Sequence, residues 1–269
     1  MYGFPFLLNL KFFTLVLLLF AIAACARWYG TETQPGENEK YAVPFLWGLF
    51  LCLLFLGLNM EIVSYYQHAV PGLMWHEGLV ATTMFWTLFS CMLVYMGIKN
   101  DWQGIRTTGI VLLTISVIKA IFFDPCFLGK YPMGYFPFGL GFLPGAFSIM
   151  AVAYAAALYG EKTRAPGDPE NKIVLYLWCL FLSALFIALN IQVVQVMPGA
   201  WNTGGQKMEF ALSSLWVGYG FVMLLAGMLK KIFPLRIAAL ALFGATLLKV
   251  FFVDFHFTGK LYKMEILLG

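Results

Sequence analysis

Charge is scarce in this sequence. Charged residues make up 11% of the 269 residues and hydrophobic residues make up 61%. An ordinary soluble domain is about 25% charged, so this composition excludes a soluble globular domain. The net charge of +4 says less than the position of the basic residues along the chain. We therefore expect a membrane protein, and we expect no nucleic-acid partner.

Sequence motifs of common enzyme classes are also missing. The sequence contains no Gly-rich phosphate loop, no nucleophile elbow and no His-Glu-x-x-His zinc motif. The cysteines have no paired spacing, which is typical of small buried hydrophobic residues: Cys25, Cys52, Cys91, Cys126 and Cys179. These absences favour a non-enzymatic role over an enzyme, and they predict no cofactor.

Long apolar runs are what the sequence has instead. Runs near the roughly 20 residues that cross a bilayer recur along the whole chain. They predict an all-α membrane protein with eight transmembrane helices, at about 6–28, 43–67, 79–98, 104–124, 136–160, 173–196, 209–229 and 234–254. Stretches rich in Gly, Pro and charged residues separate these spans and predict turns between them.

The same residue pattern occurs twice. Three charges stand 130 positions apart in two apolar segments, as Arg106, Lys119 and Asp124 and then as Arg236, Lys249 and Asp254. Other residues return at nearly the same offset: Trp47 as Trp178, Asn59 as Asn190, Trp86 as Trp216, and Gly97 as Gly227. We predict two tandem four-helix repeats, 1–132 and 133–269, the second with a short C-terminal tail. Four spans per repeat give both copies the same orientation, related by a pseudo-two-fold axis along the membrane normal.

Basic residues are unevenly divided between the two predicted sides of the membrane. One side collects Arg27, Lys40, Lys99, Arg106, Lys162, Arg164, Lys172, Lys230, Lys231 and Arg236, and the other has only Lys130, Lys207, Lys260 and Lys263 in its loops. Because short cytoplasmic loops carry an excess of Lys and Arg, we assign the first side as cytoplasmic, with Arg106 and Arg236 as anchors there. Both termini are then external.

Helix geometry predicts a polar layer in the outer third of the membrane. Asp124 lies five residues beyond Lys119, which is about 140° around an α-helix, so we expect no direct contact between them. Glu61 lies at the depth of Lys119, and we predict that these two form an ion pair, directly or through one water. We expect a matching contact between Lys249 and Gln192. The layer comprises Asn59, Glu61, Thr82, Thr83, Lys119 and Asp124, and, in the second repeat, Asn190, Gln192, Ser213, Ser214, Lys249 and Asp254.

Three roles remain open for this layer. It can hold helices together, it can bind a ligand or ion, as ionisable residues within a membrane often do, or it can dock a partner subunit. A metal or haem site is a weaker candidate. His68, His76 and His256 fall on the predicted external side, but their spacing matches no recognised ligand pattern.

The duplicated residues also carry a family resemblance. Trp216, Gly227, Leu235-Arg236 and Lys249-Val250-Phe251-Phe252-Val253-Asp254 resemble the recurrent module of bacterial multipass membrane proteins called domain of unknown function 2339. The first repeat matches through Trp86, Gly97, Arg106, Lys119, Phe122 and Asp124. Members of that family are typically much longer, with many modules. The resemblance implies a multipass protein of the bacterial cytoplasmic membrane and implies no activity.

Three functional hypotheses follow. The first is a non-enzymatic subunit or scaffold of a cell-envelope complex, whose partners are membrane lipids, other membrane subunits or further copies of itself. The second is a small transporter or lipid-handling protein with its site in the polar layer. The third is a membrane-embedded enzyme for a lipid-linked substrate, which the small number of external carboxylates, chiefly Glu77, Asp124 and Asp254, disfavours. Bound lipids are expected in each case.

Overall fold

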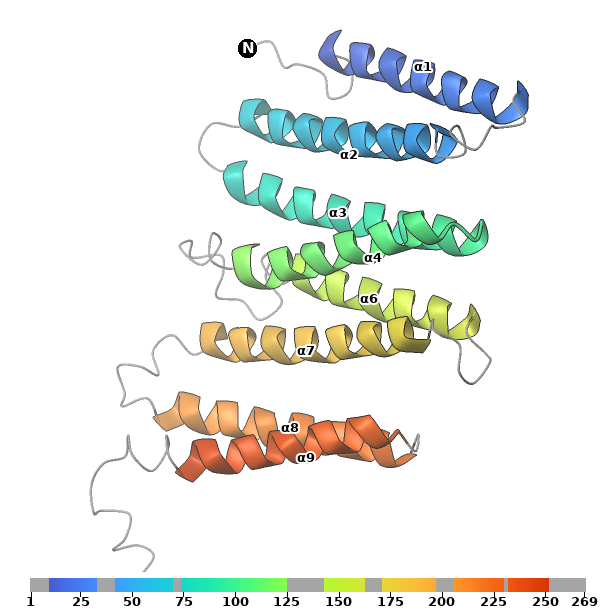
Figure 1. Ribbon diagram of the computed structural model, residues 1–269. Coiled ribbons are helices and arrows are strands. Elements are labelled where there is room, and N and C mark those ends of the chain that lie inside the picture. Colours follow the sequence, from blue (N-terminus) through green and yellow to red (C-terminus); the bar gives the residue numbers. More distant parts are fainter. Residues whose placement is uncertain are drawn as a thin grey trace, which may run out of the picture. The chain divides into compact units, whose positions relative to one another are not determined.

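The computed structural model describes residues 10–32, 42–69, 74–124, 143–162, 171–196, 206–229 and 232–251, which form eight α-helices and no strand (Figure 1). They are α1 (Leu10–Glu32), α2 (Ala42–Ala69), α3 (Met74–Lys99), α4 (Gln103–Ile118), α6 (Leu143–Lys162), α7 (Asn171–Val196), α8 (Gln206–Leu229) and α9 (Phe233–Lys249). A short π-helix, η1 (Lys119–Phe123), continues α4. The prediction of an all-helical chain is confirmed for these ranges.

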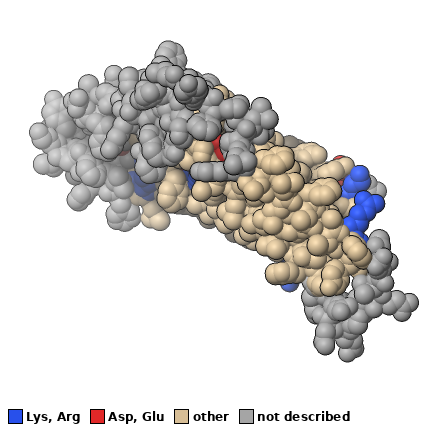
Figure 2. Space-filling model, turned by 90° about the horizontal axis from the view of Figure 1, so that it is seen from above, with Lys and Arg blue, Asp and Glu red and all other residues tan. Residues whose placement is uncertain are grey.

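Seven of these helices are long and apolar enough to cross a membrane. The described part of α9 has 17 residues and is not among the seven. Many large apolar side chains on these helices are exposed, such as Phe20 at 74% and Phe210 at 76%. Helices that are apolar around most of their circumference are typical of membrane spans, and Figure 2 shows that uncharged side chains form most of the described surface on one face.

The helices lie close to their predicted positions. The predicted span 79–98 lies within α3, and the predicted span 104–124 coincides with α4 and η1 to within one residue at each end. The described part of α6 begins at Leu143, whereas the prediction began this helix at 136. Residues 125–142 lie outside the described ranges.

The chain divides into two compact units, and the division falls inside α7. The first unit contains α1 to α6 and α7 as far as Ala184, and the second contains α7 from Leu185, α8 and α9. In the first unit, α1 packs on α2, α2 on α3, and α3 on α4. α6 then packs on α3, α4 and η1. The compact units therefore differ from the predicted repeats, because α6 falls in the predicted second repeat and belongs to the first unit by contact.

A tight turn joins α3 to α4, and glycine allows the two helices to come close. The backbone N–H of Trp102 donates to the carbonyl of Gly97 at 2.9 Å, and Asp101 between the helices has a φ of 58°. A Cβ on Gly97 would lie 2.6 Å from the backbone nitrogen of Arg106, and a Cβ on Gly109 would lie 2.8 Å from that of Val94. The helix pair therefore depends on the missing side chains at these two positions.

Candidate functional site

The π-helical turn η1 brings Lys119 and Asp124 together. The backbone N–H of Asp124 donates to the carbonyl of Lys119, five residues earlier, where an α-helix would use a carbonyl four residues earlier. The wider turn places the Lys119 ammonium 2.9 Å from a carboxylate oxygen of Asp124. The prediction that these two residues do not meet was wrong, because it assumed α-helical geometry throughout this span.

The Thr83 hydroxyl of α3 forms hydrogen bonds with both members of the ion pair. The Lys119 ammonium also donates to the Thr83 hydroxyl and to the Leu79 carbonyl, the latter at 3.3 Å. The Thr83 hydroxyl in turn lies 2.7 Å from the second carboxylate oxygen of Asp124. Asp124 and Thr83 are fully buried, and the Lys119 side chain is 16% exposed. Both charges are thus compensated by neighbouring groups, as a buried pair requires.

The predicted direct ion pair between Lys119 and Glu61 was wrong. The hydrogen bonds and ion pair of the Lys119 ammonium go to Leu79, Thr83 and Asp124, and Glu61 is not among these partners. The physical reason is the π-helical turn, which makes Asp124 rather than Glu61 the carboxylate partner of Lys119. Glu61 itself is half-buried on α2.

Asn59 binds an aromatic residue that the predicted layer omitted. The Trp86 indole N–H donates to the Asn59 side-chain oxygen at 2.6 Å, and the Asn59 amide donates to the Phe55 carbonyl at 2.8 Å. The Lys119 ammonium lies 5.9 Å from the centre of the Trp86 ring, within the range of a cation–π contact. Trp86 therefore connects α2 with the charged pair.

The same contacts recur in the second unit. The Trp216 indole N–H donates to Asn190 at 2.7 Å, and Lys249 donates to the Ser213 hydroxyl at 2.7 Å and to the Glu209 carbonyl at 3.4 Å. A π-helical turn again follows the lysine, at Val250 and Phe251. Asp254 lies outside the described residues, and the contact between Lys249 and Gln192 stays a prediction.

A cluster of hydroxyl groups lies beside the pair in the first unit. The Thr87 hydroxyl of α3 lies 2.7 Å from that of Ser116 on α4 and 2.8 Å from that of Ser148 on α6, and all three side chains are fully buried. By sequence offset, Val217 stands in the second repeat where Thr87 stands in the first. The cluster therefore joins three helices in one unit and is not part of the duplicated pattern.

The two predicted cytoplasmic anchors lie in the first turns of α4 and α9 and make contacts at the end of the preceding helix. The Arg106 side chain is 7% exposed, with its guanidinium 3.6 Å from Asp101 and 5.9 Å from the centre of the Tyr159 ring. Arg236 donates to the carbonyl of Gly227 at 2.9 Å. Arg106 thus contacts the turn after α3, and Arg236 contacts the last turn of α8. The side of the membrane on which they lie stays a prediction.

The remaining candidates take no part in the described contacts of the layer. The Thr82 hydroxyl donates to the Gly78 carbonyl in its own helix at 2.6 Å, and Ser214 is exposed. His256 and the side chains of His68 and His76 lie outside the described part of the chain. Among the described residues, no group of three or more His, Cys, Asp or Glu could hold a metal ion.

The predicted layer included neither Trp86 as a hydrogen-bond donor nor the cluster of Thr87, Ser116 and Ser148. A signal for part of the cluster was present, because Thr83, Thr87 and Ser90 lie on one face of an α-helix at a spacing of four and then three residues. No sequence signal identified Ser148, since it lies 61 residues from Thr87.

Comparison with known families agrees with the duplicated pattern. No match is found among curated proteins or among solved structures. The family described as predicted membrane protein, domain of unknown function 2339, matches twice, over residues 2–130 and 140–269. These two matches cover most of the chain, so the protein belongs to this family of membrane proteins.

Proposed function

We propose that this protein is a non-enzymatic subunit or scaffold of a membrane complex in the bacterial cell envelope. The observation that supports this role is the use of the polar layer for packing. Lys119, Asp124 and Thr83 bind one another between α3 and the α4–η1 helix, and Asn59 binds Trp86 between α2 and α3. Polar contacts of this kind hold membrane helices together.

The recurrence of these contacts supports a role in holding helices together over a role as a single ligand site. The pairs Trp86–Asn59 and Trp216–Asn190 have nearly equal hydrogen-bond lengths, 2.6 and 2.7 Å. We infer two repeats of the same orientation in the cytoplasmic membrane, with both termini external. In this proposal, the partners are lipids and other membrane subunits or further copies of the chain, and they contact the exposed apolar helix faces.

Site-specific photo-crosslinking in intact cells tests the scaffold role. A benzoylphenylalanine residue replaces exposed Phe20 or Phe210 in one set of variants and buried Leu93 or Leu113 in the control set. We expect a discrete protein adduct from an exposed position and none from the buried ones. Lipid adducts alone at the exposed positions, together with solute transport by the isolated protein in proteoliposomes, would support the transporter hypothesis instead.

Cysteine labelling tests the proposed orientation. In a background without native cysteines, Asn100→Cys places a thiol on the exposed turn between α3 and α4. A membrane-impermeant maleimide should fail to label it in intact cells and should label it after lysis. Gly72→Cys, on the predicted external side, is the control that should react in intact cells. Labelling of Asn100→Cys from outside would invert the topology.

A further inference from the structure

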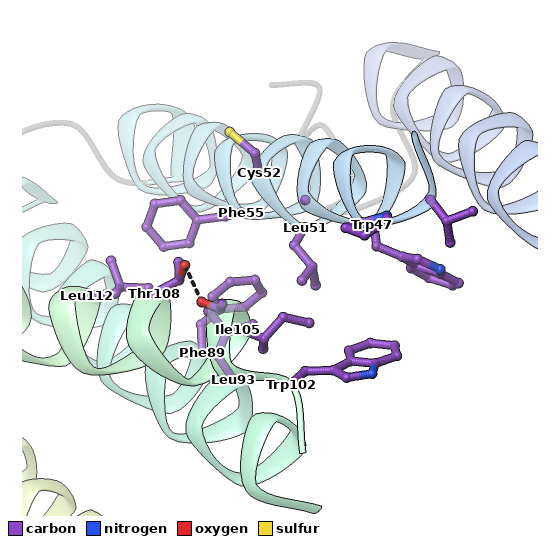
Figure 3. A pocket seen from close by; sticks show the side chains of 14 residues that line it. Trp47, Leu51, Cys52, Phe55, Phe89, Leu93, Trp102, Ile105, Thr108 and Leu112 are labelled. Atoms are coloured by element: carbon purple, nitrogen blue, oxygen red, sulfur yellow. Dashed lines mark hydrogen bonds between the residues drawn. The ribbon is translucent and has the colours of Figure 1, made fainter. Parts of the chain in front are cut away.

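An apolar groove lies between α2 and the α3–α4 helix pair. Its volume is about 730 Å³, within the roughly 300–1,000 Å³ of typical ligand sites. Figure 3 shows the side chains of α2, among them Trp47, Leu51 and Phe55, facing those of α3 and α4 across the groove. All residues that line the groove belong to the first compact unit.

The lining selects a hydrocarbon ligand. The lining side chains are almost all apolar, and the hydroxyl of Thr108 already donates to the Gly104 carbonyl at 2.9 Å (Figure 3). Phe89 and Leu93 form buried parts of the wall, whereas Cys52 and Trp102 are exposed. A polar ligand would find no charged group among the lining residues. A hydrocarbon chain would make dispersion contacts along the whole wall.

The length of the groove matches one membrane leaflet. On α2 it extends from Val43 to Phe55, and these 12 residue steps correspond to about 18 Å along a helix. The hydrocarbon of one leaflet is roughly 15 Å thick, half of a core of about 30 Å. The groove is thus long enough for one acyl chain and too short for a membrane-crossing helix.

Aromatic residues end the groove near the middle of α2. The Phe55 ring packs against the rings of Phe85, Trp86 and Phe89, with centroids 5.7, 5.6 and 5.3 Å away. At the other end, Trp102 precedes α4, and exposed Lys99 is in the last turn of α3. Tryptophan is enriched at the level of lipid headgroups, and a lysine there attracts anionic lipids. One end of the groove therefore suits a headgroup and the other the end of a chain.

We propose that this groove binds one acyl chain of an anionic phospholipid from the leaflet that contains the α3–α4 turn. The proposal is independent of the scaffold role, since a transporter or an enzyme could hold a lipid in the same place. It gives the chain a specific lipid site at the opposite end of α3 and α4 from the Lys119–Asp124 pair.

Filling the groove tests the proposal. A Cβ on Gly48 would meet nothing within 4 Å, so Gly48→Leu extends into the groove without forcing the helices apart. Gly218→Leu on α8, where a Cβ also meets nothing within 4 Å, is the matched control. The full-length protein is purified in detergent, supplied with phosphatidylglycerol or phosphatidylcholine, and analysed by native mass spectrometry.

We expect the unchanged protein and Gly218→Leu to retain one phosphatidylglycerol. Retention by Gly48→Leu should fall by roughly tenfold or more, because the new side chain displaces several lipid methylenes. Phosphatidylcholine should be retained less well than phosphatidylglycerol by the unchanged protein. Equal lipid retention by Gly48→Leu and Gly218→Leu, or no preference for the anionic lipid, would overturn the proposal.

A second readout uses two native cysteines that are both exposed, Cys52 in the groove and Cys179 on α7. Added phosphatidylglycerol should slow the maleimide labelling of Cys52 several-fold more than that of Cys179. Equal slowing of both thiols would show general coating by lipid and would count against a specific site. Protection of Cys52 by a co-purified protein in lipid-free samples would identify a helix as the occupant and would also overturn the proposal.

Discussion

At the scale of single residues, the ion pair between Lys119 and Asp124 should be the most sensitive point of the first unit. Removing one member of a buried pair typically costs about 3–5 kcal/mol, because it leaves the other charge without compensation. Lys119→Met should therefore lower the free energy of unfolding by about that amount, since Asp124 is fully buried. Unfolding of the full-length protein in mixed micelles measures the change.

The double variant Lys119→Met with Asp124→Leu is the control for this prediction. It should recover most of the lost stability, because neither charge is then left alone. Thr83→Ser should be mild, since Ser213 already performs the same role toward Lys249 at 2.7 Å. A double variant no more stable than Lys119→Met would show that the two side chains stabilise the protein by more than neutralising each other's charge.

The hydroxyl cluster gives a second prediction at this scale. Thr87→Val copies Val217 of the second repeat, but it leaves Ser116 and Ser148 buried without their shared partner. An unsatisfied buried polar group costs about 1–3 kcal/mol, so the free energy of unfolding should fall by that order. Thr87→Val combined with Ser116→Ala and Ser148→Ala should be more stable than Thr87→Val alone. A triple variant as unstable as the single one would contradict this explanation.

At the scale of helices, glycine contacts should decide whether α3 and α4 can pair. Gly97→Ala would place a Cβ 2.6 Å from the backbone nitrogen of Arg106 on α4, and overpacking of this kind costs about 1–3 kcal/mol. Gly104→Ala is the matched control, since its Cβ would meet nothing within 4 Å. Gly97→Ala should lower the thermal midpoint of the purified protein, and Gly104→Ala should leave it unchanged or raise it slightly. Equal midpoints for the two variants would show that the pairing of α3 and α4 does not depend on the missing side chain at Gly97.

The π-helical turn gives a second prediction at this scale. Deleting exposed Phe123 places the Lys119 and Asp124 side chains four positions apart, which are neighbours on an α-helix, so the pair should survive. Deleting exposed Val111 instead rotates the rest of the helix by about 100° and should separate Lys119 from Thr83. A double-mutant cycle between Lys119 and Thr83 measures their coupling, which should persist only in the first deletion. Loss of coupling in both deletions would contradict the geometric role of the turn.

Helix positions could be predicted from the sequence, and the contacts between helices only in part. The apolar runs located α3 and α4 because a bilayer sets the length of its spans. The repeat pointed to Asn59 and Lys119 because they return at a fixed offset. The partner of Lys119 could not be predicted, since one added residue in a helical turn changes which side chains meet and leaves no trace in the hydrophobic pattern. The Ser148 contact was missed because a repeat boundary says nothing about packing across it.

At the scale of the whole molecule, the position at which the chain is cut should decide whether an N-terminal fragment is stable in membranes. A fragment of residues 1–132 ends before α6, whereas a fragment of residues 1–166 includes it. Because Ser148, Val152 and Tyr159 of α6 are fully buried in the first unit, the longer fragment should resist protease in membranes and the shorter one should be degraded. Similar resistance of both fragments would show that α6 adds little to this unit.

The packing of α6 on α3 and α4 also sets an order of events during synthesis. From Phe123 to Lys162, 39 further residues must be made, which takes roughly 2–8 s at about 5–20 residues per second. The α3–α4 hairpin emerges from the ribosome before α6 by an interval of that length, with the Thr87 and Ser116 hydroxyls on a side that α6 does not yet cover. Lipid or the insertion machinery must cover that side while translation continues. Slower translation between these two points would lengthen the period in which the nascent chain is exposed to quality-control proteases.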